Sequence, residues 1–82
     1  MVKRDVKERN EGYKMAIGMK IKTLRKQHNI TQRDLAKILC VTSQAISKWE
    51  NGKNMPDISV LPMVARLFGI SMDELFDYNI TA

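Results

Sequence analysis

Two short amphipathic segments joined by a tight turn dominate the sequence, in residues 31–52. Thr31 is a good N-cap for the first segment, and the Asp34 carboxylate can bond back to the Thr31 backbone N–H in a capping-box arrangement. Thr42 is the N-cap candidate for the second segment, and Gly52 is its natural left-handed stop. The break falls at Cys40 and Val41, so the stretch predicts helices over 31–39 and 42–51.

The second helix has one apolar face and one polar face. On a wheel of about 100° per residue, Ala45, Ile46 and Trp49 share one arc. The opposite arc carries amide, hydroxyl and ammonium groups and no acid, and Glu50 lies at the border between the two. Such a face can enter the major groove of DNA without charge repulsion, and Gln can bond bidentately to adenine. We therefore expect Trp49 in the core and this polar arc in solvent: Ser43, Gln44, Ser47, Lys48 and Asn51.

The two segments resemble the helix-turn-helix of the lambda-repressor-like family, the phage repressor and Cro group, also called xenobiotic-response-element regulators. The resemblance rests on T-Q-x-x-L-A from Thr31 and S-x-A-I-S-K-W-E-N-G from Ser43, and it extends from about Ile17 to Phe76. It implies an all-α fold, a compact bundle of about five short helices. Cys40 departs from the family, which usually has Gly there, and a non-Gly residue in a left-handed turn costs on the order of 1 kcal/mol.

The resemblance also implies roles for single residues. It pairs Arg25 with Glu50 in a salt bridge that supports the recognition helix; the alternative is two separate solvated charges. Gln32 is the first residue after its cap, so its side chain and free backbone N–H lie at the positive helix end, which suits a phosphate oxygen. By resemblance Gln32 clamps the DNA backbone and braces Gln44; otherwise it is an exposed polar residue.

The function that follows is sequence-specific binding of double-stranded DNA by a transcriptional regulator, expected to be a repressor. Ser43, Gln44, Ser47 and Lys48 would reach base edges. One module makes few contacts, so we expect a homodimer at least on DNA, with half-sites about 34 Å apart or a multiple of that. The residues expected to hold the DNA backbone are Gln32, Thr42, Asn51 and Lys53.

The flanking segments set the domain boundaries. Residues 1–14 are mostly charged and polar and contain Gly12, which predicts a flexible basic arm or a frayed helical extension; the sharper interpretation is an arm that touches DNA phosphates or the minor groove. We expect the helix-turn-helix domain over 15–78, its first helix running from Met15 to Asn29, and a frayed tail over 79–82.

The fourth helix requires a choice between two caps. If Asp57 were the N-cap, Pro62 would lie beyond the first turn and its ring would clash with a carbonyl. With Ser59 as N-cap, Pro62 falls at the third helical position, where no N–H is required. This predicts a helix from Val60 to Phe68. A capping box of Ser71 and Glu74 then predicts a short final helix.

Charge and composition narrow the class of protein. Residues 1–53 hold 13 Lys and Arg against 5 Asp and Glu, net +8, whereas residues 54–82 hold 1 against 4, net −3, which together make the stated +5. A basic front suits a polyanion partner, although a solvated basic surface is the alternative. The single Cys excludes an internal disulfide and fits a reducing cytosol. We expect a cytoplasmic, bacterial or phage-encoded protein associated with the nucleoid.

Other classes find no support in the sequence. There is one His and one Cys, with no Ser-His-acid set and no phosphate-cradling glycine loop, so we expect no enzyme, no metal, no cofactor and no small-molecule ligand. No apolar run approaches the ~18 residues of a membrane span. The competing hypothesis is an antitoxin-like or other protein-interaction module that uses the acidic end around Asp73, Glu74 and Asp77. Against it, an antitoxin would normally add a longer toxin-wrapping segment after Phe76.

Overall fold

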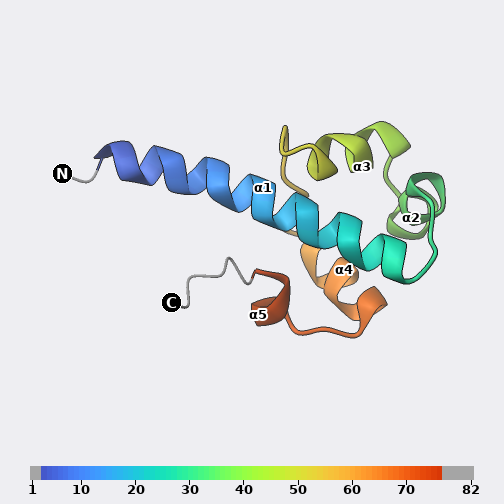
Figure 1. The fold of residues 1–82 in the computed structure, drawn as a ribbon. Helices are drawn as coiled ribbons and strands as arrows, with labels where there is room; N and C mark the ends of the chain where they lie inside the picture. The colour runs from blue at the N-terminus through green and yellow to red at the C-terminus, as the bar shows by residue number, and fades with distance from the viewer. Residues whose placement is uncertain (1–2, 77–82) are drawn as a thin grey trace.

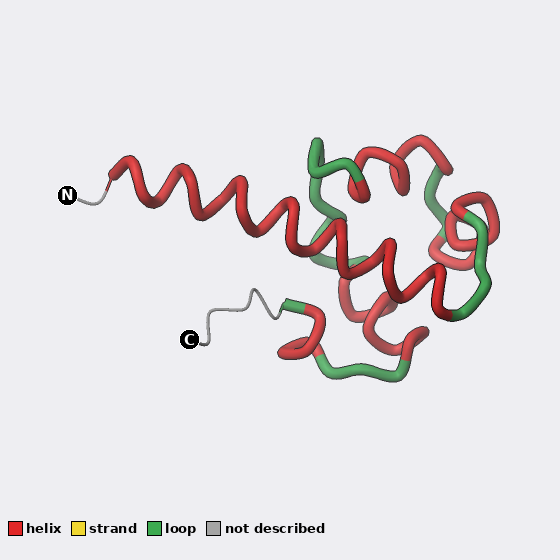
Figure 2. Tube along the Cα trace, in the orientation of Figure 1, coloured by secondary structure: helices red, strands yellow, loops and turns green. Residues whose placement is uncertain are grey.

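Five helices make up the fold in the computed structural model, which describes the backbone of residues 3–76 and the side chains of residues 14–76 (Figures 1 and 2). No strand occurs between residues 3 and 76. This confirms the predicted all-α class. The helices are α1 (Lys3–Gln27), α2 (Gln32–Leu39), α3 (Ser43–Glu50), α4 (Leu61–Phe68) and α5 (Met72–Leu75).

Helix α1 is longer than predicted. It begins at Lys3 rather than Met15 and ends at Gln27, and its N-terminal half projects beyond the other helices (Figure 1). Gly12 does not interrupt the helix as expected, because one glycine costs a helix only about 1 kcal/mol and the surrounding Lys, Arg and Glu are good helix formers. The start of the predicted first helix is therefore corrected, and the expected frayed tail over 79–82 lies outside the described residues.

The other helices lie on two sides of α1. Helices α2 and α3 pack together on one side and α4 and α5 on the other (Figure 1). Every helix contributes to one apolar core, in which the side chains of Ile21, Leu35, Ile46 and Val64 have no solvent exposure. The complete set of buried apolar residues is Ile17, Ile21, Leu35, Ala36, Leu39, Ile46, Trp49, Leu61, Val64, Ala65, Phe68 and Leu75.

Helix α1 approaches the end of α3 at a glycine. A Cβ atom at Gly18 would clash with the Trp49 carbonyl oxygen, far inside van der Waals contact. Gly18 is buried within a helix, where Ala would otherwise be favoured. The missing side chain therefore allows the backbone of α1 to lie directly against the last turn of α3.

The turn between α2 and α3 has the left-handed conformation expected at its centre. Cys40 has φ 60° and ψ 42°, and its backbone N–H bonds to the carbonyl groups of Ala36 and Lys37. Thr31 caps α2 by accepting the Asp34 N–H at 3.0 Å. The reciprocal half of the predicted capping box is absent from the hydrogen bonds of the described residues, because Asp is one methylene shorter than the usual Glu.

Helix α4 starts one residue later than predicted and has a different cap. Its N-cap is Val60, which makes no side-chain capping bond. Ser59 instead donates its hydroxyl to the Asp57 carboxylate at 2.7 Å, and Val60 N–H bonds to the Asp57 carbonyl at 2.8 Å. The Asp57–Ser59 turn thus uses the hydroxyl that was expected to cap the helix.

The final helix is as predicted. Ser71 accepts the Glu74 N–H at 3.0 Å and Glu74 accepts the Ser71 N–H at 2.9 Å, which completes the capping box. Leu75 is buried and closes the core below α4. Within the described part of the chain, no helix is long and apolar enough to cross a membrane.

We expect Gly18→Ala to destabilise the fold although it adds a better helix former. The clash with the Trp49 carbonyl outweighs the helix-propensity gain of about 1 kcal/mol, for a net loss of about 1–3 kcal/mol in unfolding free energy. Gly69 is the matched control, because it has φ 69° but open space where a Cβ would lie. Gly69→Ala should lose only the left-handed cost of about 1 kcal/mol. Urea unfolding measures both, and a stabilised Gly18→Ala would contradict the close approach.

Cys40→Gly should stabilise the domain. Cys40 is exposed, so its replacement removes no core contact, and Gly adopts the left-handed conformation without the steric cost. The gain should be about 0.5–1 kcal/mol, because the added freedom of Gly in the unfolded chain offsets part of the relief. Asn29→Gly is the control: Asn29 has φ 56°, but Asn tolerates this region, so the change should be smaller. Thermal unfolding of the three proteins compares them.

Candidate nucleic-acid interface

The two faces of α3 point as predicted. Ile46 has no solvent exposure and Trp49 has 5%, so the tryptophan side of the helix is in the core. Gln44 and Lys48 are exposed on the other side. The remaining predicted base contacts, Ser43 and Ser47, are half-buried. The outer face therefore exposes Gln44 and Lys48 as expected, whereas the hydroxyls of Ser43 and Ser47 are less exposed than expected.

The N-terminus of α3 is capped in a way that leaves a donor free. Thr42 has extended backbone angles, and its hydroxyl oxygen accepts the Ala45 N–H at 3.1 Å. A hydroxyl that accepts one hydrogen bond still has its own O–H to donate. Thr42 is exposed, so this O–H and the positive end of α3 face solvent together.

A loop folds back over the other end of α3. The Lys48 carbonyl accepts the backbone N–H groups of Lys53 at 2.9 Å and Asn54 at 3.4 Å. Gly52 in this loop has φ 73° and lies against Met15 of α1. Asn51 and Lys53, both predicted phosphate contacts, are exposed beside the outer face of α3.

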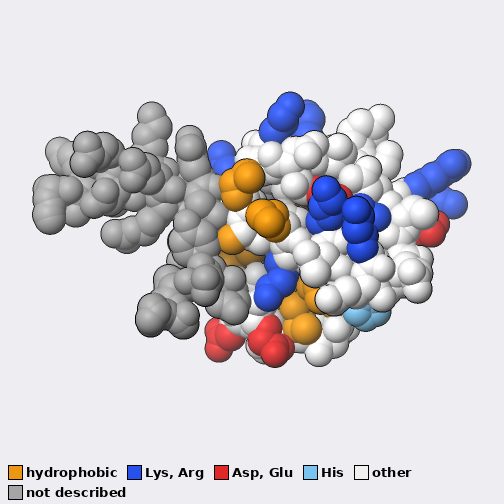
Figure 3. Space-filling model, viewed as in Figure 1, with side chains coloured by type: hydrophobic (Ala, Val, Ile, Leu, Met, Phe, Trp, Pro, Cys, Tyr) orange, Lys and Arg blue, Asp and Glu red, His pale blue; other side chains and the backbone are white. Residues whose placement is uncertain are grey.

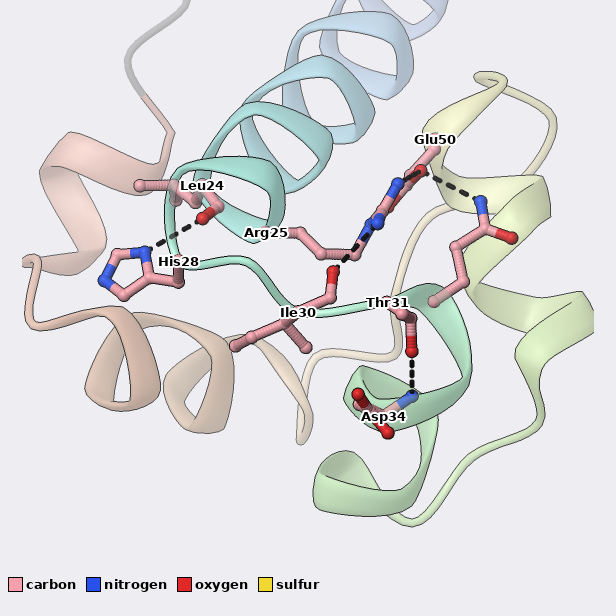
Figure 4. Close-up of polar contacts among 8 residues, drawn as sticks. Leu24, Arg25, His28, Ile30, Thr31, Asp34 and Glu50 are labelled. Carbon is pink, nitrogen blue, oxygen red and sulfur yellow. Dashed lines mark hydrogen bonds and ion pairs between the residues drawn. The ribbon is translucent and has the colours of Figure 1, made fainter.

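A buried ion pair ties α3 to α1, as the resemblance implies (Figure 4). Arg25 donates from Nε to Glu50 Oε2 at 2.7 Å and from Nη2 to Glu50 Oε1 at 3.0 Å. Arg25 Nη1 also donates to the Ile30 carbonyl at 2.9 Å. Both charged residues are more than nine-tenths buried, and the two parallel bonds fix the orientation of both planar groups. The alternative of two separate solvated charges is wrong.

The Gln32 amide joins the same network rather than bracing Gln44 as the resemblance implied, and the sequence did not predict this contact. Its Nε2 donates to Glu50 Oε1 at 3.0 Å, and the residue is half-buried at the start of α2. The Glu50 carboxylate therefore accepts three hydrogen bonds, and it connects α1, α2 and α3. The sequence offered one signal for this contact: a carboxylate at the border of the core has about four acceptor sites, so Glu50 can accept a further donor beside a bidentate Arg. The backbone N–H of Gln32 stays free at the helix N-terminus.

Charge is distributed unevenly over the surface. In Figure 3, Lys and Arg side chains lie over α1, near the loop that follows α3 and at the edge by α2, where an acidic side chain lies beside them, and other Asp and Glu side chains lie at the lower edge, over α5. The acids at that edge are Asp73 and Glu74, both exposed. Among the described residues, no three His, Cys, Asp or Glu side chains gather in a way that could hold a metal ion.

Comparison with known proteins decides the family. The model of the helix-turn-helix family HTH_3 matches residues 21–75, which include all of α2, α3, α4 and α5. The chain belongs to this helix-turn-helix family. The lambda-repressor-like resemblance of residues 31–52 is thereby confirmed, and the family is one of DNA-binding transcriptional regulators.

Relatives of this HTH_3 chain include named regulators. It is 41% identical over 61 residues to the HTH-type transcriptional activator BcrR of Enterococcus faecalis, covering 74% of this chain and 30% of that protein. It is 41% identical over 60 residues to the uncharacterized HTH-type transcriptional regulator MJ0272 of Methanocaldococcus jannaschii, covering 73% and 91%. The antitoxin PezA of Streptococcus pneumoniae is 33% identical over 55 residues, covering 67% and 35%. The chain thus spans less than a third of BcrR and most of MJ0272.

A solved structure supports the fold of the HTH_3 chain. The crystal structure of an HTH_3 family transcriptional regulator from Vibrio cholerae superposes with a TM-score of 0.72, covering 85% of this chain and 39% of that one. At 23% identity, this likeness concerns the fold alone. The helical arrangement around α1 is therefore that of a known HTH_3 regulator.

The three-way contact at Glu50 predicts a ranked loss of stability. Arg25→Ala leaves a buried carboxylate without its cation and should cost about 3–5 kcal/mol of unfolding free energy. Gln32→Ala removes one hydrogen bond to that carboxylate and should cost about 1.5–3 kcal/mol. Glu50→Gln should fall near Arg25→Ala, since it leaves the guanidinium unpaired. Urea unfolding of these variants tests the ranking. Glu50→Ala and the double variant Arg25→Ala with Glu50→Ala complete a double-mutant cycle, and additive single effects in that cycle would contradict a direct pair.

Proposed function

We propose that this protein binds double-stranded DNA in a sequence-specific manner and regulates transcription, with α3 in the major groove. The observation that carries this proposal is the two-sidedness of α3. Its inner face holds buried Ile46 and Trp49, and its outer face offers Gln44 and Lys48 to solvent with no acid among them. An α-helix of this kind fits the width of the major groove.

The outer face of α3 supplies the chemistry for base recognition. The Gln44 amide can donate to and accept from adenine together, and Lys48 can donate to the acceptors of guanine. Ser43 and Ser47 carry hydroxyls that bond to either kind of base edge. These four residues are the proposed base contacts; Gln44 and Lys48 are exposed, and Ser43 and Ser47 are half-buried.

Four other groups surround that face and suit phosphate oxygens. The free backbone N–H of Gln32 and the O–H of Thr42 lie at the starts of α2 and α3, where the helix dipole favours an anion. Asn51 and Lys53 lie exposed where the loop folds back over the end of α3. Contacts at both ends of α3 would fix its position in the groove.

Two copies of the protein on a two-fold symmetric operator would bind DNA more tightly than one copy. One α3 of eight residues reads few base pairs, and helix-turn-helix dimers bind half-sites about 34 Å apart. Occupation of an operator is sufficient to block access to a promoter, so we propose repression, in the cytoplasm, as the mode of action. The antitoxin-like alternative rests on the exposed acids Asp73 and Glu74 of α5 and on the PezA match, which covers 35% of PezA.

Gln44 and Lys53 should have different effects on binding. After selection of a bound sequence from random duplex DNA, Gln44→Ala should weaken that sequence by ~1–3 kcal/mol and lose discrimination at one base pair. Lys53→Ala should weaken all sequences alike and lower the salt slope of log K by about one unit. Titration of fluorescent duplexes at several salt concentrations separates the two effects.

Arg66→Ala is the matched charge control for this experiment. Arg66 is exposed on α4, on the other side of α1 from α3, so its removal should change affinity and salt slope far less than Lys53→Ala (Figure 1). Unchanged sequence preference in Gln44→Ala would remove the proposed base contact. No duplex affinity at low salt, together with a complex with a partner protein, would favour the protein-interaction module.

A further inference from the structure

A hollow between α2 and α4 lies outside the proposed DNA surface. Its volume is about 270 Å³. Helix α4, which forms one wall, lies on the other side of α1 from α3 (Figure 1). None of its lining residues belongs to the base or phosphate contacts proposed above. They are Ile38 and Leu39 from the last turn of α2, and Met63, Arg66 and Leu67 from α4.

The walls of this groove expose large apolar side chains. Ile38 on one wall is 47% exposed and Met63 on the other is 40% exposed, whereas Leu39 at the base is buried. A single exposed apolar residue is ordinary on a protein surface. Two such residues on either side of a hollow form a site into which another apolar side chain could pack. Its binding would be favourable because apolar surface is removed from water.

The charge of the groove is positive and uncompensated. Arg66 is its only charged lining residue, and within residues 14–76 the Arg66 guanidinium forms no ion pair with a carboxylate. Helix α4 contains no Asp or Glu, and Lys37 is exposed beside Ile38. The one acid of α2, Asp34, lies in its first turn, at the other end of the helix from the groove. A ligand that carries a carboxylate would therefore complement the positive charge of this groove.

We propose that the α2–α4 groove binds a short acidic amphipathic segment of a partner protein. One apolar side chain of the segment packs between Ile38 and Met63, and a carboxylate about one turn away pairs with Arg66. The hollow is smaller than the roughly 300–1,000 Å³ of most small-molecule pockets, and a single side chain suits it better. Because none of the residues that line the groove belongs to the proposed DNA contacts, the partner and DNA can bind at the same time. This proposal does not depend on the DNA-binding one.

The test uses the full chain and two synthetic helix-forming peptides. The first peptide has Leu along one face and Glu beside it, and the second has Lys at every Glu position. In backbone-amide NMR titrations, the Glu peptide should give saturable shifts centred on Ile38, Met63 and Arg66, and the Lys peptide should bind at least about tenfold more weakly. Arg66→Glu should weaken the Glu peptide by about tenfold or more and strengthen the Lys peptide.

Two further variants make the outcome decisive. Met63→Glu, at an exposed wall position, should reduce Glu-peptide binding as Arg66→Glu does, so the result does not rest on one variant. Lys48→Glu should reduce duplex affinity and leave peptide affinity unchanged. The proposal is overturned by equal Glu-peptide affinity in Arg66→Glu, by shifts centred on Gln44 and Lys53, or by shifts that do not saturate.

Discussion

The contact of α1 with the end of α3 is the constraint on which the rest of the structure depends. Gly18 lets the two backbones meet at the Trp49 carbonyl, and the Arg25–Glu50 pair closes the same junction with two short bonds. A buried ion pair contributes little net stability, because desolvation offsets its attraction. Its geometry is nevertheless strict, so a rotation of α3 about its own axis would break both bonds at once. The outer face of α3 is thereby held in one orientation.

Much of this arrangement could be predicted from the residues. The periodicity of α3 predicted that Trp49 is buried and Gln44 exposed, because eight residues hold one apolar arc and one polar arc. The caps Thr42 and Ser71 were predictable because a hydroxyl before a helix has one dominant use, to accept an N–H of the first turn. The Arg25–Glu50 pair came from family resemblance; spacing along the chain alone does not reveal a contact between residues 25 positions apart.

The features that the sequence did not reveal depend on competition between partners. The Ser59 hydroxyl could cap α4 or donate to the Asp57 carboxylate. It donates to Asp57, which is only two residues away along the chain. Gln32 could remain in solvent or bond to Glu50, and only the packed position of α3 brings that carboxylate near. Gly18 carries no side-chain signal, so its role appears only when a second backbone lies against it. In each case the tertiary arrangement selects among options that local chemistry leaves open.

Fixing α3 at both ends separates stability from recognition. The Thr42 hydroxyl accepts a backbone N–H of the first turn of α3. The last turn is held by the hydrogen bonds to Glu50 and by the loop N–H groups that donate to the Lys48 carbonyl. No buried side-chain nitrogen or oxygen among residues 14–76 lacks a hydrogen-bond partner. The side chain of Gln44 forms none of these bonds, so a substitution there changes the chemistry of the outer face of α3 without changing how the helix is held. If α3 recognises DNA as proposed, such a scaffold would acquire a new target sequence by surface substitutions alone, while Arg25, Glu50 and Gly18 stay the same.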